Sequence, residues 1–189
     1  MGNRRNDLLD AAIEVLGGSG MHGLTHRRVD AAAGLPAGSC SNHFRTRDAL
    51  LEAVVERFAD RERHNFEAIL MESVPHGPAE LAQVLTRMAH DAVGPHRTLT
   101  LARYAILVEA GIHPSLRARL LTTGARVNAY FMAWLRLAGS TDPDRQAPLI
   151  MNYWTGVVLH ELAVPDPAFD PSEQLTSLVT AVFGAEVPT

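Results

Sequence analysis

The seven residues from Ala37 to His43 are small or polar, and their side chains could form hydrogen bonds with a nucleic acid. The stretch reads Ala37-Gly38-Ser39-Cys40-Ser41-Asn42-His43. Hydroxyl and amide groups can bond base edges or phosphates, and small side chains let a backbone approach them closely. Arginines flank the stretch and could hold phosphates: Arg27, Arg28, Arg45 and Arg47. A core-facing helix would need Leu or Ile here, so the pattern indicates non-covalent DNA recognition.

The preceding residues have the features of a short helix that would position this stretch. Thr25 can cap a helix whose apolar face begins at Val29. Gly34 ends that helix as a C′ glycine, and Pro36 suits the first position of a second helix. Two short helices joined by a glycine turn form a helix-turn-helix, whose second helix enters the major groove of DNA. An ordinary helical hairpin with a solvated face is the alternative.

This arrangement predicts which side chains meet DNA. Phe44 is the expected anchor that packs the second helix against the domain. The predicted DNA-binding residues are Thr25, Arg27, Arg28, Ala37, Ser39, Cys40, Ser41, Asn42, His43 and Arg47. For Cys40 a role as a small filler residue is favoured over a thiol sensor, because the chain has no second cysteine to resolve an oxidised thiol.

Over roughly its first 55 residues the chain resembles the tetracycline-repressor (TetR) family of bacterial transcription regulators. The matching residues are Gly23-Leu24-Thr25, Val29, Ala32-Ala33-Gly34-Leu35, Gly38-Ser39, His43-Phe44, Arg47 and Leu50-Leu51. The remaining chain resembles the family in length and helical character. Many members have an aromatic residue that touches the DNA backbone where this chain has Ser41. Here Asn42 or His43 would replace that contact.

Other residues whose side chains could take part in catalysis or metal binding do not form a complete site. His160-Glu161 begins a zinc-protease motif, but the second histidine ligand, four residues on, is replaced by Val164. Gly17-Gly18-Ser19-Gly20 lacks the strand and the lysine of a phosphate loop. Asp142 and Asp144 have the positions of helix caps. We therefore expect no enzyme, no cofactor and no metal site, with a composite site from the scattered histidines as the alternative.

Composition places the chain among globular proteins of one domain or two small ones. It has 189 residues, of which 47% are hydrophobic and 20% charged. The single cysteine excludes an internal disulfide, and neither a secretory signal nor a membrane-spanning run is visible, so a cytoplasmic location is expected. The net charge of −4 divides into +2 for residues 1–47 and −6 for the rest. This asymmetry favours a DNA-facing head and an acidic body.

Hydrophobic spacing predicts an all-α fold of about nine helices. We expect a three-helix DNA-binding head over residues 1–47 and a helical ligand-binding and dimerisation body over residues 48–189. The first helix should run from residue 6 or 7 to Leu16 and end at the glycines that follow. The helices expected after the helix-turn-helix are 48–72, 79–93, 98–110, 115–138, 148–162 and 172–183.

The expected body carries aromatic and sulphur-containing side chains at core positions. Plain core packing explains most of them, and the functional interpretation is an apolar ligand cavity between helices. The predicted ligand-binding residues are Phe66, Met88, Tyr104, Asn128, Phe131 and Trp154. The last two helices are more apolar than surface helices should be and could pack in a homodimer. The predicted dimer interface is Val157, Val158, Leu175, Leu178 and Val179.

These observations support one main functional hypothesis. The chain is expected to be a dimeric transcription regulator, most often a repressor in this family, which binds a palindromic operator in double-stranded DNA. A small apolar or aromatic effector would release the protein from its operator by binding its two conformations with different affinities. The alternatives are an all-helical ligand-binding or scaffold protein that does not bind DNA, and an enzyme with an unrecognised helical site.

Overall fold

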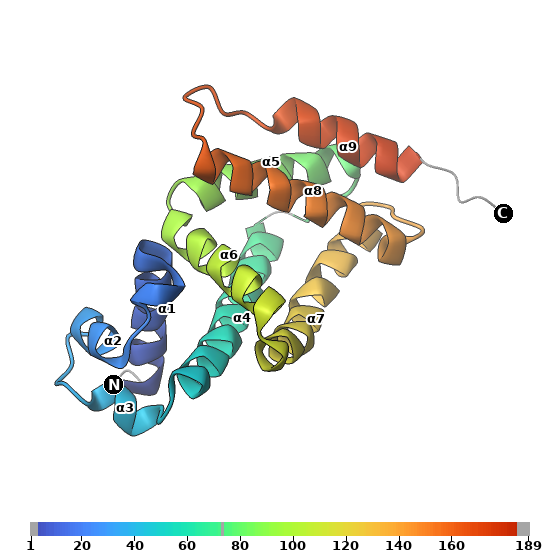
Figure 1. Cartoon of the computed structure of the whole chain (residues 1–189). Helices are drawn as coiled ribbons and strands as arrows, with labels where there is room; N and C mark the ends of the chain where they lie inside the picture. The colour runs from blue at the N-terminus through green and yellow to red at the C-terminus, as the bar shows by residue number, and fades with distance from the viewer. Residues whose placement is uncertain (1–3, 73, 185–189) are drawn as a thin grey trace. The chain divides into compact units, whose positions relative to one another are not determined.

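The computed structural model describes residues 4–72 and 74–184, and all of its regular structure is helical (Figure 1). The all-α prediction is therefore confirmed. The elements are α1 (Arg4–Gly23), α2 (His26–Ala32), α3 (Ser39–His43), α4 (Arg47–Glu72), α5 (Pro78–Val93), α6 (Arg97–Ile112), α7 (Pro114–Leu137), α8 (Pro143–Ala163) and α9 (Ser172–Gly184). In this part of the chain, no helix is both long and apolar enough to cross a membrane.

Three predicted boundaries are wrong. α1 continues past Leu16 to Gly23, with a kink at Gly20, whose φ of 65° is left-handed. α3 starts at Ser39 and not at Pro36. α8 starts at Pro143, because Asp142 caps it by accepting a hydrogen bond from the Arg145 N–H. The helix then continues through Pro148, which removes one backbone donor close to the start of the helix.

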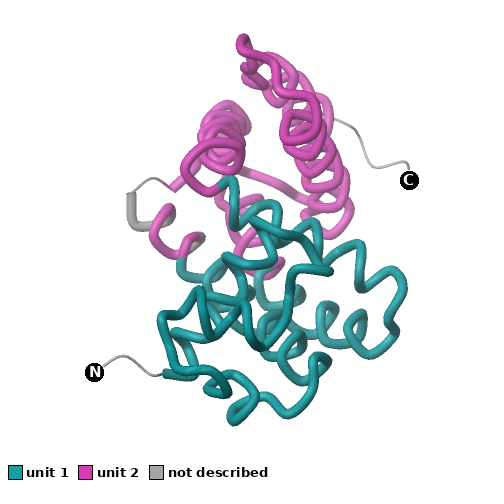
Figure 2. The backbone as a smooth tube through the Cα atoms, turned by 60° about the vertical axis from the view of Figure 1, so that its left-hand side comes forward, with its two compact units in different colours: residues 1–64, 97–127 teal, residues 65–96, 128–189 magenta. Residues whose placement is uncertain are grey.

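The chain divides into two compact units (Figure 2). Unit 1 comprises residues 1–64 and 97–127, and unit 2 comprises residues 65–96 and 128–189. Unit 1 therefore contains the three helices of the expected head together with α6 and the first parts of α4 and α7. The functional division after residue 47 stays a prediction.

The core of unit 1 joins the helix-turn-helix to α6. Apolar side chains of α1, including Leu9, Ile13 and Leu16, belong to one buried cluster with Ala102 and Ile106 of α6. Ion pairs cover this core: Arg57 of α4 donates two hydrogen bonds to the Asp10 carboxylate of α1, at 2.7 and 2.9 Å. The head is thus packed directly on α6 and α4.

The core of unit 2 is built by α5, α8, α9 and the second half of α7. Large buried side chains include Leu85, Trp134, Ile150 and Val158. The Trp154 indole N–H donates a hydrogen bond to the Leu85 carbonyl oxygen at 3.0 Å. This bond satisfies the polar atom of an otherwise apolar side chain and fixes α8 on α5.

Candidate nucleic-acid interface

Two short helices and the turn between them form the predicted helix-turn-helix in unit 1 (Figure 1). The Thr25 hydroxyl caps α2 by accepting a hydrogen bond from the Arg28 N–H at 3.3 Å. Gly34 follows α2 with a φ of 65°, which glycine adopts without steric cost. Gly38, with a φ of 94°, precedes α3. The capping and glycine predictions for α2 are thereby confirmed.

Asp30 of α2 holds the turn in place, and the sequence reasoning missed this role. Its carboxylate accepts hydrogen bonds from the Gly38 N–H at 2.8 Å and from the Cys40 N–H at 2.7 Å. Only 4% of Asp30 is exposed. A buried carboxylate that bonds two N–H groups at the start of α3 fixes how far this helix stands from α2. An acidic residue among alanines, eight residues before Gly38, was the available signal.

Phe44, just after α3, is the anchor that the sequence predicts. Its ring is 4% exposed and belongs to the core of unit 1. The Arg5 guanidinium lies 5.4 Å from the ring centroid, a cation–π distance. The His26 Nε2 donates a hydrogen bond to the Phe44 carbonyl oxygen at 2.7 Å. α3 is therefore held at both ends, by Asp30 and by Phe44.

The side chains of α3 divide into an outer and an inner set. Asn42 and His43 are exposed, as is Ala37 in the turn before the helix, while Ser39 and Ser41 are half-buried. The Ser39 hydroxyl donates to the Pro36 carbonyl oxygen, and the Ser41 hydroxyl to that of Gly38. Both protons are used within the turn, so these hydroxyls would meet DNA chiefly as acceptors. Asn42 and His43 are the polar groups available for base edges.

Cys40 was predicted to contact DNA, and that prediction is wrong. Its side chain is fully buried in the core of unit 1. Burial raises the pKa of the Cys40 thiol to about 11, and the nearby Asp30 carboxylate adds to this effect. A neutral, buried thiol packs as a small apolar group, as the filler interpretation expects.

The arginines of the head differ in their availability for phosphates. Arg27 and Arg28 are exposed on α2. Arg47, by contrast, donates a hydrogen bond to the Met21 carbonyl oxygen at 3.0 Å and lies 3.9 Å from the Glu109 carboxylate of α6. Arg47 therefore connects α4 to the end of α1 and to α6. Its predicted contact with a phosphate would compete with these partners.

The predicted ligand-binding residues are dispersed in the described chain. Tyr104 is buried in unit 1, and its burial raises the pKa of the phenol. Phe131 and Trp154 are buried in unit 2, Met88 is half-buried there, and Asn128 is exposed. The side chain of Phe66 lies outside what the structure describes. Core packing accounts for Phe131, whose ring meets Trp134 edge-on, and for Trp154.

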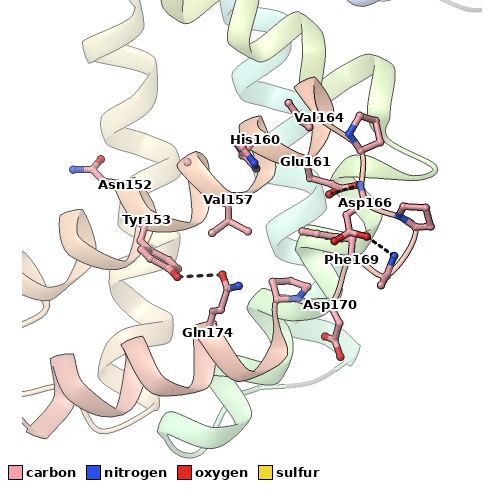
Figure 3. Close-up of a pocket in the computed structure, with 15 residues that line it drawn as sticks. Asn152, Tyr153, Val157, His160, Glu161, Val164, Asp166, Phe169, Asp170 and Gln174 are labelled. Atoms are coloured by element: carbon pink, nitrogen blue, oxygen red, sulfur yellow. Dashed lines mark hydrogen bonds between the residues drawn. The ribbon is translucent and has the colours of Figure 1, made fainter.

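Each unit has a ligand-sized hollow. In unit 2 a groove of about 910 Å³ lies between α8, the loop after it and α9 (Figure 3). The Tyr153 hydroxyl donates to Gln174 at 3.2 Å across it. In unit 1 a hollow of about 320 Å³ lies between α4 and α7 and has charged walls that include Asp60 and Arg126. The unit 1 hollow is lined mainly by charged and polar residues, whereas the unit 2 groove has a lining of apolar residues interrupted by polar ones such as His160 and Asp170. None of the predicted ligand-binding residues lines either hollow, so the position of the effector site stays a prediction.

The predicted dimer residues are mostly inside the protomer. Val158, Leu175 and Val179 are fully buried within unit 2, so they cannot face a partner, and this part of the prediction is wrong. Their apolar spacing builds the packing of α8 and α9 on α5. Val157 and Leu178 are half-buried, and Val157 lines the groove. The exposed face of α8 carries other residues.

Family models match both parts of the chain. One described as "Bacterial regulatory proteins, tetR family" matches residues 8–54, and one described as "Tetracyclin repressor-like, C-terminal domain" matches residues 76–185. The first range includes the whole helix-turn-helix described above. The second covers more than half of the chain.

Individual relatives agree with these models. The chain is 35% identical over 80 residues to the HTH-type transcriptional regulator BetI of Escherichia coli O45:K1, a stretch that covers 41% of this chain and 40% of that relative. A TetR-family structure from Streptomyces coelicolor A3, SCO1917, has a TM-score of 0.72 and 28% identity and covers 97% of this chain and 100% of its own. The multidrug binding protein EbrR, complexed with ethidium, has a TM-score of 0.71 and 29% identity. The match covers 95% of this chain and 98% of the EbrR chain.

Proposed function

The chain belongs to the tetracycline-repressor-like family of bacterial regulatory proteins, and we propose that it is a ligand-responsive, DNA-binding transcription regulator of the repressor type. Residues 1–47 are the DNA-binding head, and residues 48–189 serve ligand binding and dimerisation. The protein acts in the cytoplasm, where its operator lies, and catalyses no reaction.

The observation that carries this proposal is the presentation of α3. Asp30 and Phe44 fix both ends of the helix, and Asn42 and His43 are left exposed. A rigid short helix with exposed polar groups suits direct contact with base edges, because it loses little conformational entropy when it binds. Arg27 and Arg28 stand on the neighbouring helix for phosphates.

A homodimer would place two such helices on two half-sites of a palindromic operator. Half-sites of helix-turn-helix dimers lie about one helical turn of DNA apart, or a multiple of it. The distance between the two heads then determines the affinity of the dimer for the operator. An effector that changes this spacing releases the protein from DNA.

The proposed effector is a small apolar or aromatic molecule. The relative EbrR has been crystallised with ethidium, an observation about that protein that favours an aromatic effector here. In this chain α6 packs on α1 within unit 1, so a displacement of α6 would move the head directly. The effector shifts DNA affinity only by its unequal binding to the two conformations.

The test is selection of DNA fragments by the purified protein, followed by titration of the selected site at several salt concentrations. The expected result is an enriched palindrome whose binding weakens steeply with salt, because counterions are released from the phosphates. Absence of any enriched sequence, with no salt-dependent binding, would favour the helical scaffold instead. Hydrophobic dyes that stabilise the protein are then assayed for release of the operator.

A further inference from the structure

The hollow of about 320 Å³ in unit 1 lies between α4 and α7, outside the helix-turn-helix. α4 contributes positions 56, 59, 60 and 63, and α7 contributes positions 119, 122, 123, 126 and 127. These positions recur every three or four residues, so each helix presents one face to the hollow. One water occupies about 30 Å³ in the liquid, so the hollow has room for a molecule of roughly ten non-hydrogen atoms.

Hydrogen bonds between α4 and α7 show how these two faces are aligned. Arg119 of α7 donates to the Glu56 carboxylate of α4 at 2.7 Å, and the two residues are 63 positions apart in the sequence. Within unit 2, the Tyr130 hydroxyl of α7 donates to the Glu67 carboxylate of α4 at 2.8 Å, and this pair is also 63 positions apart. A constant separation means that the two helices run parallel, with each residue of α4 level with the residue 63 positions later.

This alignment places two arginines at the same level. Arg126 of α7 is level with Arg63 of α4, and both line the hollow. Facing side chains on packed helices are usually not of like charge, because like charges repel. Arg126 is exposed and has no hydrogen-bond or ion-pair partner among the described residues. An anion between the two guanidinium groups fits this arrangement, since the planar fork of arginine binds a carboxylate through two parallel hydrogen bonds.

The other donors that line the hollow already have acceptors. The Thr122 and Thr123 hydroxyls donate to backbone carbonyl oxygens one turn earlier in α7, each at 3.0 Å. Arg119 donates to Glu56 at 2.7 Å and to Glu52 at 3.3 Å. An anion in the hollow would therefore bind at the level of the two facing arginines.

The remaining lining favours a ligand with one negative charge and a small apolar part. Three arginines and two carboxylates line the hollow, which leaves an excess of one positive charge. The exposed Asp60 carboxylate is one of these and would repel a second anionic group. Ala59 and Val127 are half-buried and offer apolar surface to the body of a ligand.

We propose that this hollow binds a small organic monocarboxylate, whose carboxylate is held by Arg126 and Arg63 and whose body packs on Ala59 and Val127. The site goes beyond the proposed function, since it is separate from the DNA-binding surface and takes an anion in place of an apolar effector. Because α4 follows directly on the helix-turn-helix, a ligand that bridges α4 and α7 would restrain the helix that leads out of the head.

Benzoate and benzamide test the charge that the site selects. The two molecules have nearly the same size and shape, and only benzoate carries a carboxylate. Isothermal titration calorimetry of the full chain at constant ionic strength should show benzoate binding at least about ten-fold tighter than benzamide, the difference expected for a charge-assisted hydrogen bond. Inorganic phosphate, as a third probe, should bind more weakly than benzoate because it has no apolar part. Equal binding of benzoate and benzamide, phosphate binding as tight as that of benzoate, or no binding of benzoate would overturn the proposal.

Two substitutions with opposite expected effects locate the site. Arg126→Gln should weaken benzoate binding about ten-fold or more, and Asp60→Asn should strengthen it several-fold by removing a like charge. A gain in affinity cannot come from damaged folding, and urea unfolding of both variants checks that the fold is kept. Arg136→Gln is the matched control, because Arg136 is an exposed arginine of α7 that does not line the hollow. Equal losses for the two arginine variants, or weaker binding by Asp60→Asn, would contradict the assignment.

The binding measurements need no DNA, so their outcome is independent of the proposed function. A protein that selects benzoate through Arg126 and binds no DNA would refute the proposed function alone. A protein that binds an operator and does not distinguish benzoate from benzamide would refute this inference alone.

Discussion

The backbone of Gly17 in α1 lies so close to Thr98 in α6 that a Cβ added at position 17 would overlap the Thr98 carbonyl oxygen. Atoms cannot overlap in this way, so only glycine fits. The two helices are therefore in backbone contact at this point, inside unit 1. Any movement of the start of α6 must be transmitted to α1 or break this contact.

Gly17→Ala should destabilise the protein by about 1–3 kcal/mol, the usual cost of overpacking. The neighbouring Gly18→Ala is the control: Gly18 has no atom within 4 Å of an added Cβ, so alanine should stabilise the helix by up to about 1 kcal/mol. Urea unfolding of both variants measures the difference. Equal effects for the two variants would show that α1 and α6 approach each other less closely than the structure shows.

Asp30→Asn should detach α3 from its support. One amide position can still accept a hydrogen bond, but the other presents N–H groups to a backbone N–H, leaving a buried donor unsatisfied at a cost of about 1–3 kcal/mol. DNA affinity should fall. Asp48→Asn removes the same charge from an exposed position and should leave affinity equal or slightly higher. If both variants bind DNA equally, the Asp30 carboxylate does not position α3.

Asn42→Ala should alter sequence preference, with a loss of about 1–3 kcal/mol at one operator position if Asn42 makes a bidentate contact. Arg27→Ala should instead weaken binding to all sequences alike and reduce the salt slope by about one unit. Site selection with each variant, followed by salt titrations, measures both effects. An unchanged base profile for Asn42→Ala would argue against base contacts by this side chain.

The Cys40 thiol should resist thiol reagents at pH 8 until the protein unfolds, because it is buried and its pKa is raised to about 11. Because the pKa is higher in the folded state, the contribution of this thiol to the free energy of unfolding is fully present below the unfolded-state pKa of about 8.5. That contribution is lost as the pH rises towards 11. Unfolding free energies from pH 8 to 11 should therefore fall more steeply for the wild type than for Cys40→Ala. Parallel curves would exclude this linkage.

Local chemistry made much of the fold predictable. Thr25 and Gly34 have the predicted capping and turn roles because each role depends on immediate neighbours, and Phe44 has the predicted anchoring role because it is the one large apolar residue beside a run of small and polar ones. Cys40 was expected both to fill space and to contact DNA, and its burial agrees with the first expectation and excludes the second, because the core against which α3 packs decides which side chains face inward.

The dimer residues were missed for a different reason. Val158, Leu175 and Val179 are apolar at helical spacing, and both an internal core and a subunit interface require such residues. Only the partner helices decide between the two, and here α5 covers this face. The role of Asp30 was missed because its hydrogen-bond donors lie eight and ten residues away, beyond the range of helix periodicity.

The two tryptophans of the chain, Trp134 and Trp154, are both buried, and both belong to unit 2. Unit 1 contains the helix-turn-helix and no tryptophan. Intrinsic tryptophan fluorescence therefore observes the packing of one unit, whereas circular dichroism observes the helices of both. Recording the two signals together during denaturation gives an optical comparison of how each unit melts, with no label attached to the protein.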